Sequence, residues 1–235
     1  MKFILVFAGV LLLALLGLWV GGRFVDRASH DPGVEANARL IGYASVALLI
    51  PLAADVITGI RPGLLAHALI GFLLVPLVLL KLGSVAYRFV RYYAGDTHYR
   101  AAGPPELVMR LIAPALVLLT VALFATGIEL WLFGFRFGDQ WLTWHKAVFV
   151  LWFLAAMFHA LAYVRRAPEL VLADSHDRLL GVGARRSVVI GSLVLGAALV
   201  VAMLPFPSPF ALPAGATPFG IVVTRSNRGE RDDRE

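Results

Sequence analysis

The chain has 235 residues, of which 60% are hydrophobic and 15% are charged, and its mean hydropathy is +0.81. Soluble domains are nearer half apolar and a quarter charged, so this composition excludes a soluble enzyme and any disordered or fibrous protein. The chain has no cysteine, which excludes disulfides, thiolate-bound clusters, thiolate zinc sites and C-x-x-C-H attachment of haem. The net charge of +6 does not predict a nucleic-acid partner here, because an arginine excess in a membrane protein marks its cytoplasmic loops.

Six stretches are long and apolar enough to cross a lipid bilayer, which takes about 20 residues each. They cover residues 3–22, 40–60, 64–87, 111–135, 142–164 and 187–204. Each is expected to be a helix, because lipid cannot satisfy an unpaired backbone, and internal prolines such as Pro51, Pro76 and Pro114 are tolerated there. The predicted fold is therefore an all-α integral membrane bundle over residues 1–205. Residues 206–235 are expected to form an outward-facing Pro-rich segment and a disordered tail.

The arginines predict the orientation of this bundle in the inner (plasma) membrane. Twelve of them would share one face: Arg23, Arg27, Arg39, Arg88, Arg91, Arg100, Arg110, Arg165, Arg166, Arg178, Arg185 and Arg186. This face should be cytoplasmic, which puts both termini outside. The first stretch is interpreted as a retained span, because its heavier positive charge follows it and no A-x-A cleavage site is present; a signal peptide is the alternative.

Three of the six histidines fall within the predicted spans, where an ionisable side chain is costly and usually marks a functional site. His145 and His159 are 14 residues apart on the fifth span, and His67 and Lys81 are 14 apart on the third. Fourteen residues return a helix to within about 40° of its starting direction and rise about 21 Å. Because the third and fifth spans run in the same direction, they present an outer pair, His67 with His145, and an inner pair, Lys81 with His159.

The outer pair has the ligand set of a haem b bound without covalent attachment, namely two neutral imidazoles on opposite faces of a flat ring. Zinc would need three or four protein ligands. Gly71 lies one turn after His67 and would let the ring approach the helix. The sequence therefore predicts haem-iron ligation by His67 and His145, with His159 as a third candidate ligand for a second haem.

The pattern H-x-x-x-G on one span, followed by two histidines on another, resembles the bacterial membrane cytochromes b. These include the cytochrome b561-like proteins and the haem-bearing gamma subunits of formate dehydrogenase. Three further segments resemble actinobacterial membrane proteins of this kind: VLLKLGS at 78–84, RYYAGD at 91–96 and GPP at 103–105. The resemblance covers the second to fifth spans and implies a four-helix haem-binding core flanked by the first and sixth spans. A di-haem member would carry histidine where this chain has Lys81, so the number of haems is left at one or two.

Lys81 has three interpretations. Its stem could carry the charge to the cytoplasmic headgroups, its amine could ligate an inner haem opposite His159, or its charge could lie beside a haem propionate or quinone. Asp55 and Glu129 near the outer side either sit in the solvated interface, accept a proton from a quinol, or hold a ligand histidine.

Three cations occur at the same depth as the outer pair: Arg61, Arg136 and Lys146. They either bind haem propionates, for which the arginine fork is well suited, or contact lipid phosphates.

The expected function is that of a membrane electron-transfer subunit, which passes electrons between quinone and a redox partner protein. The chain has no nucleotide-binding fingerprint, so it would be one component of an oxidoreductase system. Two alternatives are a multi-span transporter, against which the absence of an inverted repeat counts, and a cofactor-free membrane anchor or assembly protein.

Overall fold

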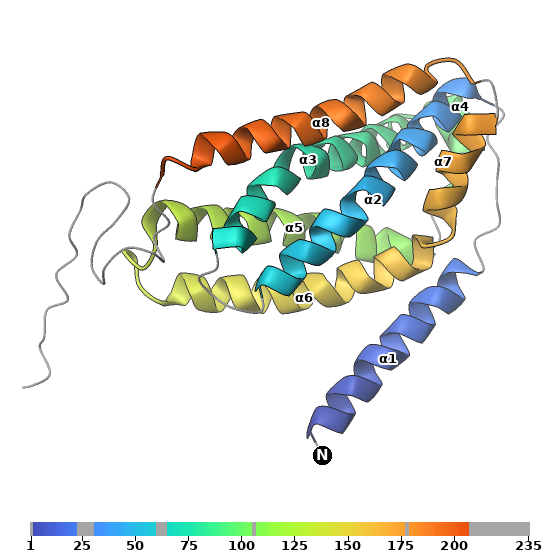
Figure 1. Cartoon of the computed structure of the whole chain (residues 1–235). Helices are drawn as coiled ribbons and strands as arrows, with labels where there is room; N and C mark the ends of the chain where they lie inside the picture. The colour runs from blue at the N-terminus through green and yellow to red at the C-terminus, as the bar shows by residue number, and fades with distance from the viewer. Residues whose placement is uncertain (1, 23–30, 60–64, 105–106, 177–178, 207–235) are drawn as a thin grey trace, which may run out of the picture.

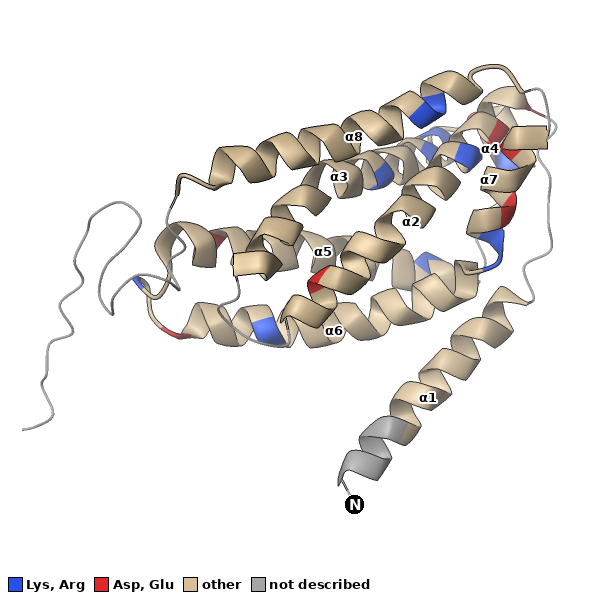
Figure 2. Cartoon of the chain, viewed as in Figure 1, with Lys and Arg blue, Asp and Glu red and all other residues tan. Residues whose placement is uncertain are grey.

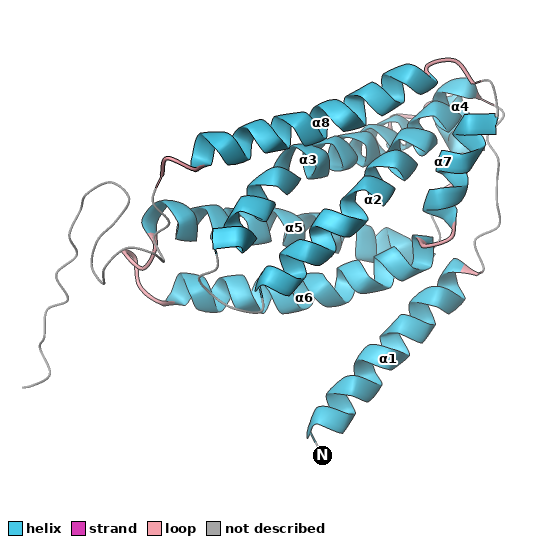
Figure 3. Cartoon of the chain, viewed as in Figure 1, coloured by secondary structure: helices cyan, strands magenta, loops and turns pink. Residues whose placement is uncertain are grey.

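A computed structural model describes residues 2–22, 31–59, 65–104, 107–176 and 179–206, and side chains from residue 8 onward. Every regular element within these ranges is a helix (Figure 3), which confirms the all-α class. The helices are α1 (Lys2–Gly21), α2 (Pro32–Gly59), α3 (Leu65–Tyr93), α4 (Thr97–Ala101), α5 (Leu107–Phe133), α6 (Gln140–Tyr163), α7 (Arg166–His176) and α8 (Val182–Met203). The segment predicted at 206–235 lies outside the described residues, apart from Phe206.

Five helices, α2, α3, α5, α6 and α8, are long and apolar enough to cross a membrane. The chain therefore has the helices of a multi-pass membrane protein. In α1 the apolar stretch with described side chains, Ala8–Gly21, is shorter than a span requires.

Several helices extend beyond the stretches predicted from hydropathy, and α2 and α3 do so by the most residues. α2 begins at Pro32 instead of residue 40, and α3 continues to Tyr93 instead of residue 87. The polar start of α2 is stabilised by the Asp31 side chain, which accepts hydrogen bonds from two backbone N–H groups, and by an ion pair of 2.9 Å between Glu35 and Arg39 one turn apart. Hydropathy alone detects only the membrane-embedded part of such helices.

The prolines behave as predicted. Pro51, Pro76 and Pro114 lie inside α2, α3 and α5, and each helix continues on both sides of its proline. Neighbouring helices and local adjustments compensate for the missing N–H group in such spans.

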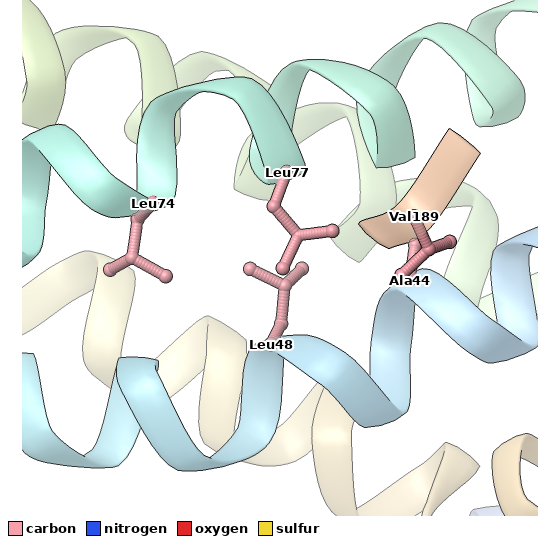
Figure 4. Packing of buried hydrophobic residues seen from close by; sticks show 5 residues of the cluster. All are labelled: Ala44, Leu48, Leu74, Leu77 and Val189. Carbon is pink, nitrogen blue, oxygen red and sulfur yellow. The ribbon is translucent and has the colours of Figure 1, made fainter. Parts of the chain in front are cut away.

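The long helices lie side by side as a bundle in which α3 and α6 run in the same direction and α2, α5 and α8 run in the opposite one (Figure 1). α2 packs closely on α3, α5 packs on α6, and α8 covers α3, whereas contacts between α3 and α5 are few. The core between α2, α3 and α8 contains small and aliphatic side chains (Figure 4): Ala44, Leu48, Leu74, Leu77 and Val189. Close packing of α2 on α3, and of α5 on α6, leaves space between these two pairs of helices.

α1 packs against α6 through small residues. A Cβ on Gly21 would clash with the backbone carbonyl of Ala162, so glycine is required for this close approach. Val20 is buried with Met109, Phe158 and Ala162 in a second core cluster. The C-terminal half of α1 is thus an integral part of the bundle.

Most of the described basic residues gather at one end of the bundle, which we call the basic end (Figure 2). Two short helices that hydropathy did not predict, α4 and α7, lie at this end and carry His98 and His176. The opposite end contains the turn between α5 and α6, at residues 134–139.

A buried carboxylate holds the basic end together. Asp174 on α7 has a fully buried side chain and accepts hydrogen bonds from Arg39 Nη1 at 3.2 Å and from Arg185 Nε at 3.1 Å. Burial alone would raise the pKa of the Asp174 carboxyl, but its hydrogen bonds with Arg185 and Arg39, and their charges, outweigh burial and lower this pKa. This network links α2, α7 and α8.

Candidate functional site

The outer pair predicted from the sequence comes together in the structure. The ring centroids of His67 and His145 are 6.2 Å apart, and the ring planes are inclined at 72°. His67 is the third residue of α3 and His145 is the sixth residue of α6. Both imidazoles therefore lie close to the end of the bundle that is opposite the basic end.

The Nδ1 atom of His67 faces two oxygens of one residue on α2. It lies 3.1 Å from the backbone carbonyl oxygen of Asp55 and 3.1 Å from the carboxylate Oδ1 atom of the same residue. The carbonyl makes the hydrogen bond, and the buried Oδ1 atom has no hydrogen bond of its own. Because both neighbours are acceptors, we assign the ring hydrogen of neutral His67 to Nδ1.

His145 has a matching arrangement with α5. Its Nδ1 atom lies 2.9 Å from the hydroxyl oxygen of Thr126. This hydroxyl is within 2.8 Å of the carbonyl oxygen of Ala122, to which it donates its one hydrogen, so it accepts the hydrogen bond from His145. We therefore assign the ring hydrogen of His145 to Nδ1 as well.

The same edge of each ring rests against a glycine of the neighbouring helix. A Cβ on Gly59 would lie 3.0 Å from the Cε1 and Nδ1 atoms of His67, and a Cβ on Gly127 would lie 3.3 Å from the Cε1 atom of His145. A larger residue at either position would displace the ring, so both glycines help to fix the orientation of the imidazoles.

These contacts leave both Nε2 atoms available. Within the described part of the chain, neither Nε2 has a hydrogen-bond partner. If an ion lies about 2 Å from each imidazole nitrogen, and each ring centre about 1 Å further away, two opposed rings have centroids about 6 Å apart. The observed centroid separation of 6.2 Å is close to this value.

A cavity of about 190 Å³ opens beside the two rings. Its wall is mostly aliphatic and aromatic and comes from α2, α3, α5 and α6, which are the four helices expected to form the core. The aromatic side chains of this wall include Phe72, which meets Trp131 edge to face with centroids 5.3 Å apart. At Gly71 the wall is open, because a Cβ built there would meet no heavy atom within 4 Å.

The inner pair differs from the outer pair. Lys81 and His159 do not line this cavity, although they are close enough to interact electrostatically. The Nδ1 atom of His159 is buried and has no hydrogen-bond partner, and its ring packs against Tyr163 with centroids 4.8 Å apart. The structure therefore offers no orienting acceptor for this histidine among the described residues.

The remaining candidates are placed in different surroundings. Lys146 lines the cavity next to His145. Arg136 does not, and its guanidinium lies 5.4 Å from the centre of the Phe137 ring. Arg61 lies outside the described residues. Glu129 is not part of the cavity wall, and both of its carboxylate oxygens are buried without a hydrogen-bond partner.

Sequence reasoning missed Thr126, Gly59 and Gly127 as parts of the site. A hydroxyl and a glycine adjacent to each other in an apolar span, as at positions 126–127, are the signal that could have drawn attention to α5. Asp55 was considered as a partner of a ligand histidine, and the structure places its carbonyl and its carboxylate beside His67.

The described residues form no cluster of three or more His, Cys, Asp or Glu side chains that could hold a metal ion. A zinc site made of protein ligands alone would need such a cluster. Comparison with known proteins gives no match, since no family model, curated protein or solved structure is similar to this chain.

Proposed function

We propose that this chain binds one haem b between His67 and His145 and carries electrons between quinone and a redox partner protein in the membrane. The observation that supports this proposal most strongly is the outer pair itself. Two imidazoles have ring centroids 6.2 Å apart, their Nδ1 atoms are engaged by acceptors, and their Nε2 atoms are left for a ligand.

The residues around the pair fit a flat, largely apolar group. The site offers two protein ligands, which is sufficient for a haem iron that has four equatorial ligands of its own, whereas zinc would lack ligands. The cavity wall is mostly apolar, and the open space at Gly71 lies one helical turn from His67. Lys146 provides a cation at the wall for an anionic substituent.

When bound, haem b supplies one-electron oxidation and reduction. The protein's contribution is to hold and orient the ligands. Asp55 and Thr126 fix the tautomer and the direction of the two imidazoles, as outer hydrogen-bond partners commonly do for ligand histidines. The apolar wall excludes water, which is one of the ways in which a protein tunes the potential of a bound redox group.

The membrane context of the proposal follows from the arrangement of the helices and from the basic end. The core would be α2, α3, α5 and α6, with α1 and α8 as flanking spans, and the basic end would face the cytoplasm of a cell bounded by its inner (plasma) membrane. Both termini would then be outside. The close packing of α1 on α6 favours a retained first span over a cleaved signal peptide.

The test is the haem content and low-spin absorption spectrum of purified membranes that contain His67→Ala or His145→Ala. Either change removes one ligand, so we expect haem to be lost or to become five-coordinate. His98→Ala and His176→Ala are matched controls, because these histidines lie in α4 and α7 at the basic end and should leave the spectrum unchanged.

A full complement of low-spin haem in both His67→Ala and His145→Ala would disprove the ligand assignment. A wild-type protein without any dithionite-sensitive visible spectrum would favour the alternatives, namely a transporter or a cofactor-free membrane anchor.

A further inference from the structure

We infer that the chain holds a single haem and exchanges electrons only at the end of the bundle opposite the basic end, so that its redox partner must approach from that side. The inference rests on the proposed function. It is drawn from the inner pair and from how far the cavity extends along α3 and α6.

The cavity belongs to one half of the bundle. Along α3 its lining residues run from His67 to Val78, and along α6 from Leu142 to Trp152. From His145 to the last residue of α6, Tyr163, the helix continues for 18 residues, or about 27 Å at 1.5 Å per residue. An electron that crossed the whole bundle would therefore need a second carrier near the basic end.

On α6 the cavity lining ends at Trp152. Trp152 is buried and donates a hydrogen bond of 2.9 Å from Nε1 to the hydroxyl of Thr120 on α5. This hydrogen bond joins α6 to α5 at the level where the cavity lining ends on α6.

The inner pair lacks the features that make the outer pair a ligand site. Lys81 is not an imidazole, and an ammonium must lose its proton before it can bind iron. His159 has no acceptor at its Nδ1 atom, whereas His67 and His145 each have one. Neither residue of the inner pair lines the cavity. We therefore assign Lys81 and His159 to helix packing and charge placement and not to a second haem.

The resulting electron exchange is a one-electron step without transfer of atoms or protons. A donor at the outer-pair end would give one electron to a haem held by His67 and His145, and an acceptor at the same end would take that electron from the haem. The experiment uses ferricyanide, an anion that does not cross membranes, as the acceptor. It becomes ferrocyanide as the ferrous haem returns to ferric.

The first measurement is haem per chain, by pyridine haemochrome, in the purified full-length protein. We expect one. Two haems per chain would overturn the inference while leaving the proposed function intact, and no haem at all would instead disprove the proposed function.

The second measurement is the rate of haem oxidation by ferricyanide in sealed vesicles of both orientations, after reduction with a membrane-permeant quinol. We expect oxidation in vesicles that expose the turn between α5 and α6, and none in vesicles that expose the basic end until detergent opens them. The basic end attracts an anionic oxidant, so charge steering would act against this result. Oxidation from the basic end in sealed vesicles would overturn the inference.

The orientation can be determined in the same samples because the chain has no cysteine. Phe137→Cys puts one reactive thiol at an exposed position in the turn between α5 and α6, and Ser175→Cys puts one at an exposed position at the basic end. Labelling with an impermeant maleimide then reports which end faces the bulk solution, independently of the arginine rule.

Discussion

Replacing Thr126 by valine tests whether the partner of a ligand histidine matters as much as the geometry indicates. Valine has nearly the same shape as threonine but cannot accept the hydrogen bond that Nδ1 of His145 makes at 2.9 Å. The imidazole would keep its place against Gly127 but lose the interaction that fixes its tautomer and its rotation.

Loss of such an outer hydrogen-bond partner typically weakens metal binding by about 10- to 100-fold, which corresponds to about 1.4 to 2.8 kcal/mol. We expect a loss of this size for haem affinity, because one of the two proposed haem ligands is affected and the other, His67, keeps its own acceptor. The fold should be little changed, since the carbonyl of Ala122 keeps its helical hydrogen bond when the hydroxyl is removed.

The assay is titration of haem b into the detergent-solubilised protein without haem, with the low-spin absorption as the readout. Thr126→Ser retains the hydroxyl and should bind like the wild type. Thr120→Val is the matched control on the same helix, because its hydroxyl accepts a hydrogen bond from Trp152 and not from His67 or His145. Equal affinity in Thr126→Val and wild type would refute the role assigned to this hydrogen bond.

Two further predictions use other parts of the molecule. Gly71→Leu should abolish haem binding while the helices remain folded, because the leucine side chain would occupy the open space beside His67. Gly83→Leu on the same helix, where a Cβ also has no neighbour within 4 Å, should retain haem. Haem content and circular dichroism, measured on both variants, check this prediction. Asp174→Asn should lower the free energy of unfolding in detergent by about 3 to 5 kcal/mol, because it leaves the buried guanidinium of Arg185 without its carboxylate partner, and exposed Glu169→Gln should be nearly neutral. The pKa of Asp174 is lowered in the folded state. Its ion pairs therefore contribute their full stability above about pH 3.9, the pKa of the unfolded state, and this stability is lost as the pH falls through the lower folded-state pKa. In Asp174→Asn, a series of unfolding measurements over pH should lack this acid-dependent component.

Much of the bundle was predictable because the bilayer makes hydropathy a strong signal. A long apolar run in lipid has to be helical, and the structure places a helix at each predicted stretch. The ends of α2 and α3 were less predictable, because polar turns at a helix end are stabilised by caps and ion pairs that hydropathy does not register. α7 was missed for a related reason, since it is short and its apolar and polar residues balance over its length.

The network around Asp174 shows a second limit. Arg39 is 135 residues from Asp174 in the sequence, whereas Arg185 is 11 residues from it, and each alone resembles an ordinary charged residue at a span boundary. Only the packing of α7 across the ends of α2 and α8 brings them together. The arginine rule used Arg39 and Arg185 to predict orientation, but it could not show that both also pair with one buried carboxylate.

The two predicted pairs show what spacing can and cannot establish. Lys81 follows His67 by 14 residues on one helix, and His159 follows His145 by 14 residues on the other, so a count along the chain treats the outer and inner pairs alike. A ligand site also needs an acceptor for each Nδ1 atom and open space beside the rings. Both depend on which helices are neighbours: α2 brings the Asp55 carbonyl to His67, and α5 brings the Thr126 hydroxyl to His145. The inner pair meets neither requirement, since the Nδ1 atom of His159 has no hydrogen-bond partner and neither Lys81 nor His159 lines the cavity. Equal spacing therefore places residues at equal depth, and the neighbouring helices determine which depth can bind a ligand.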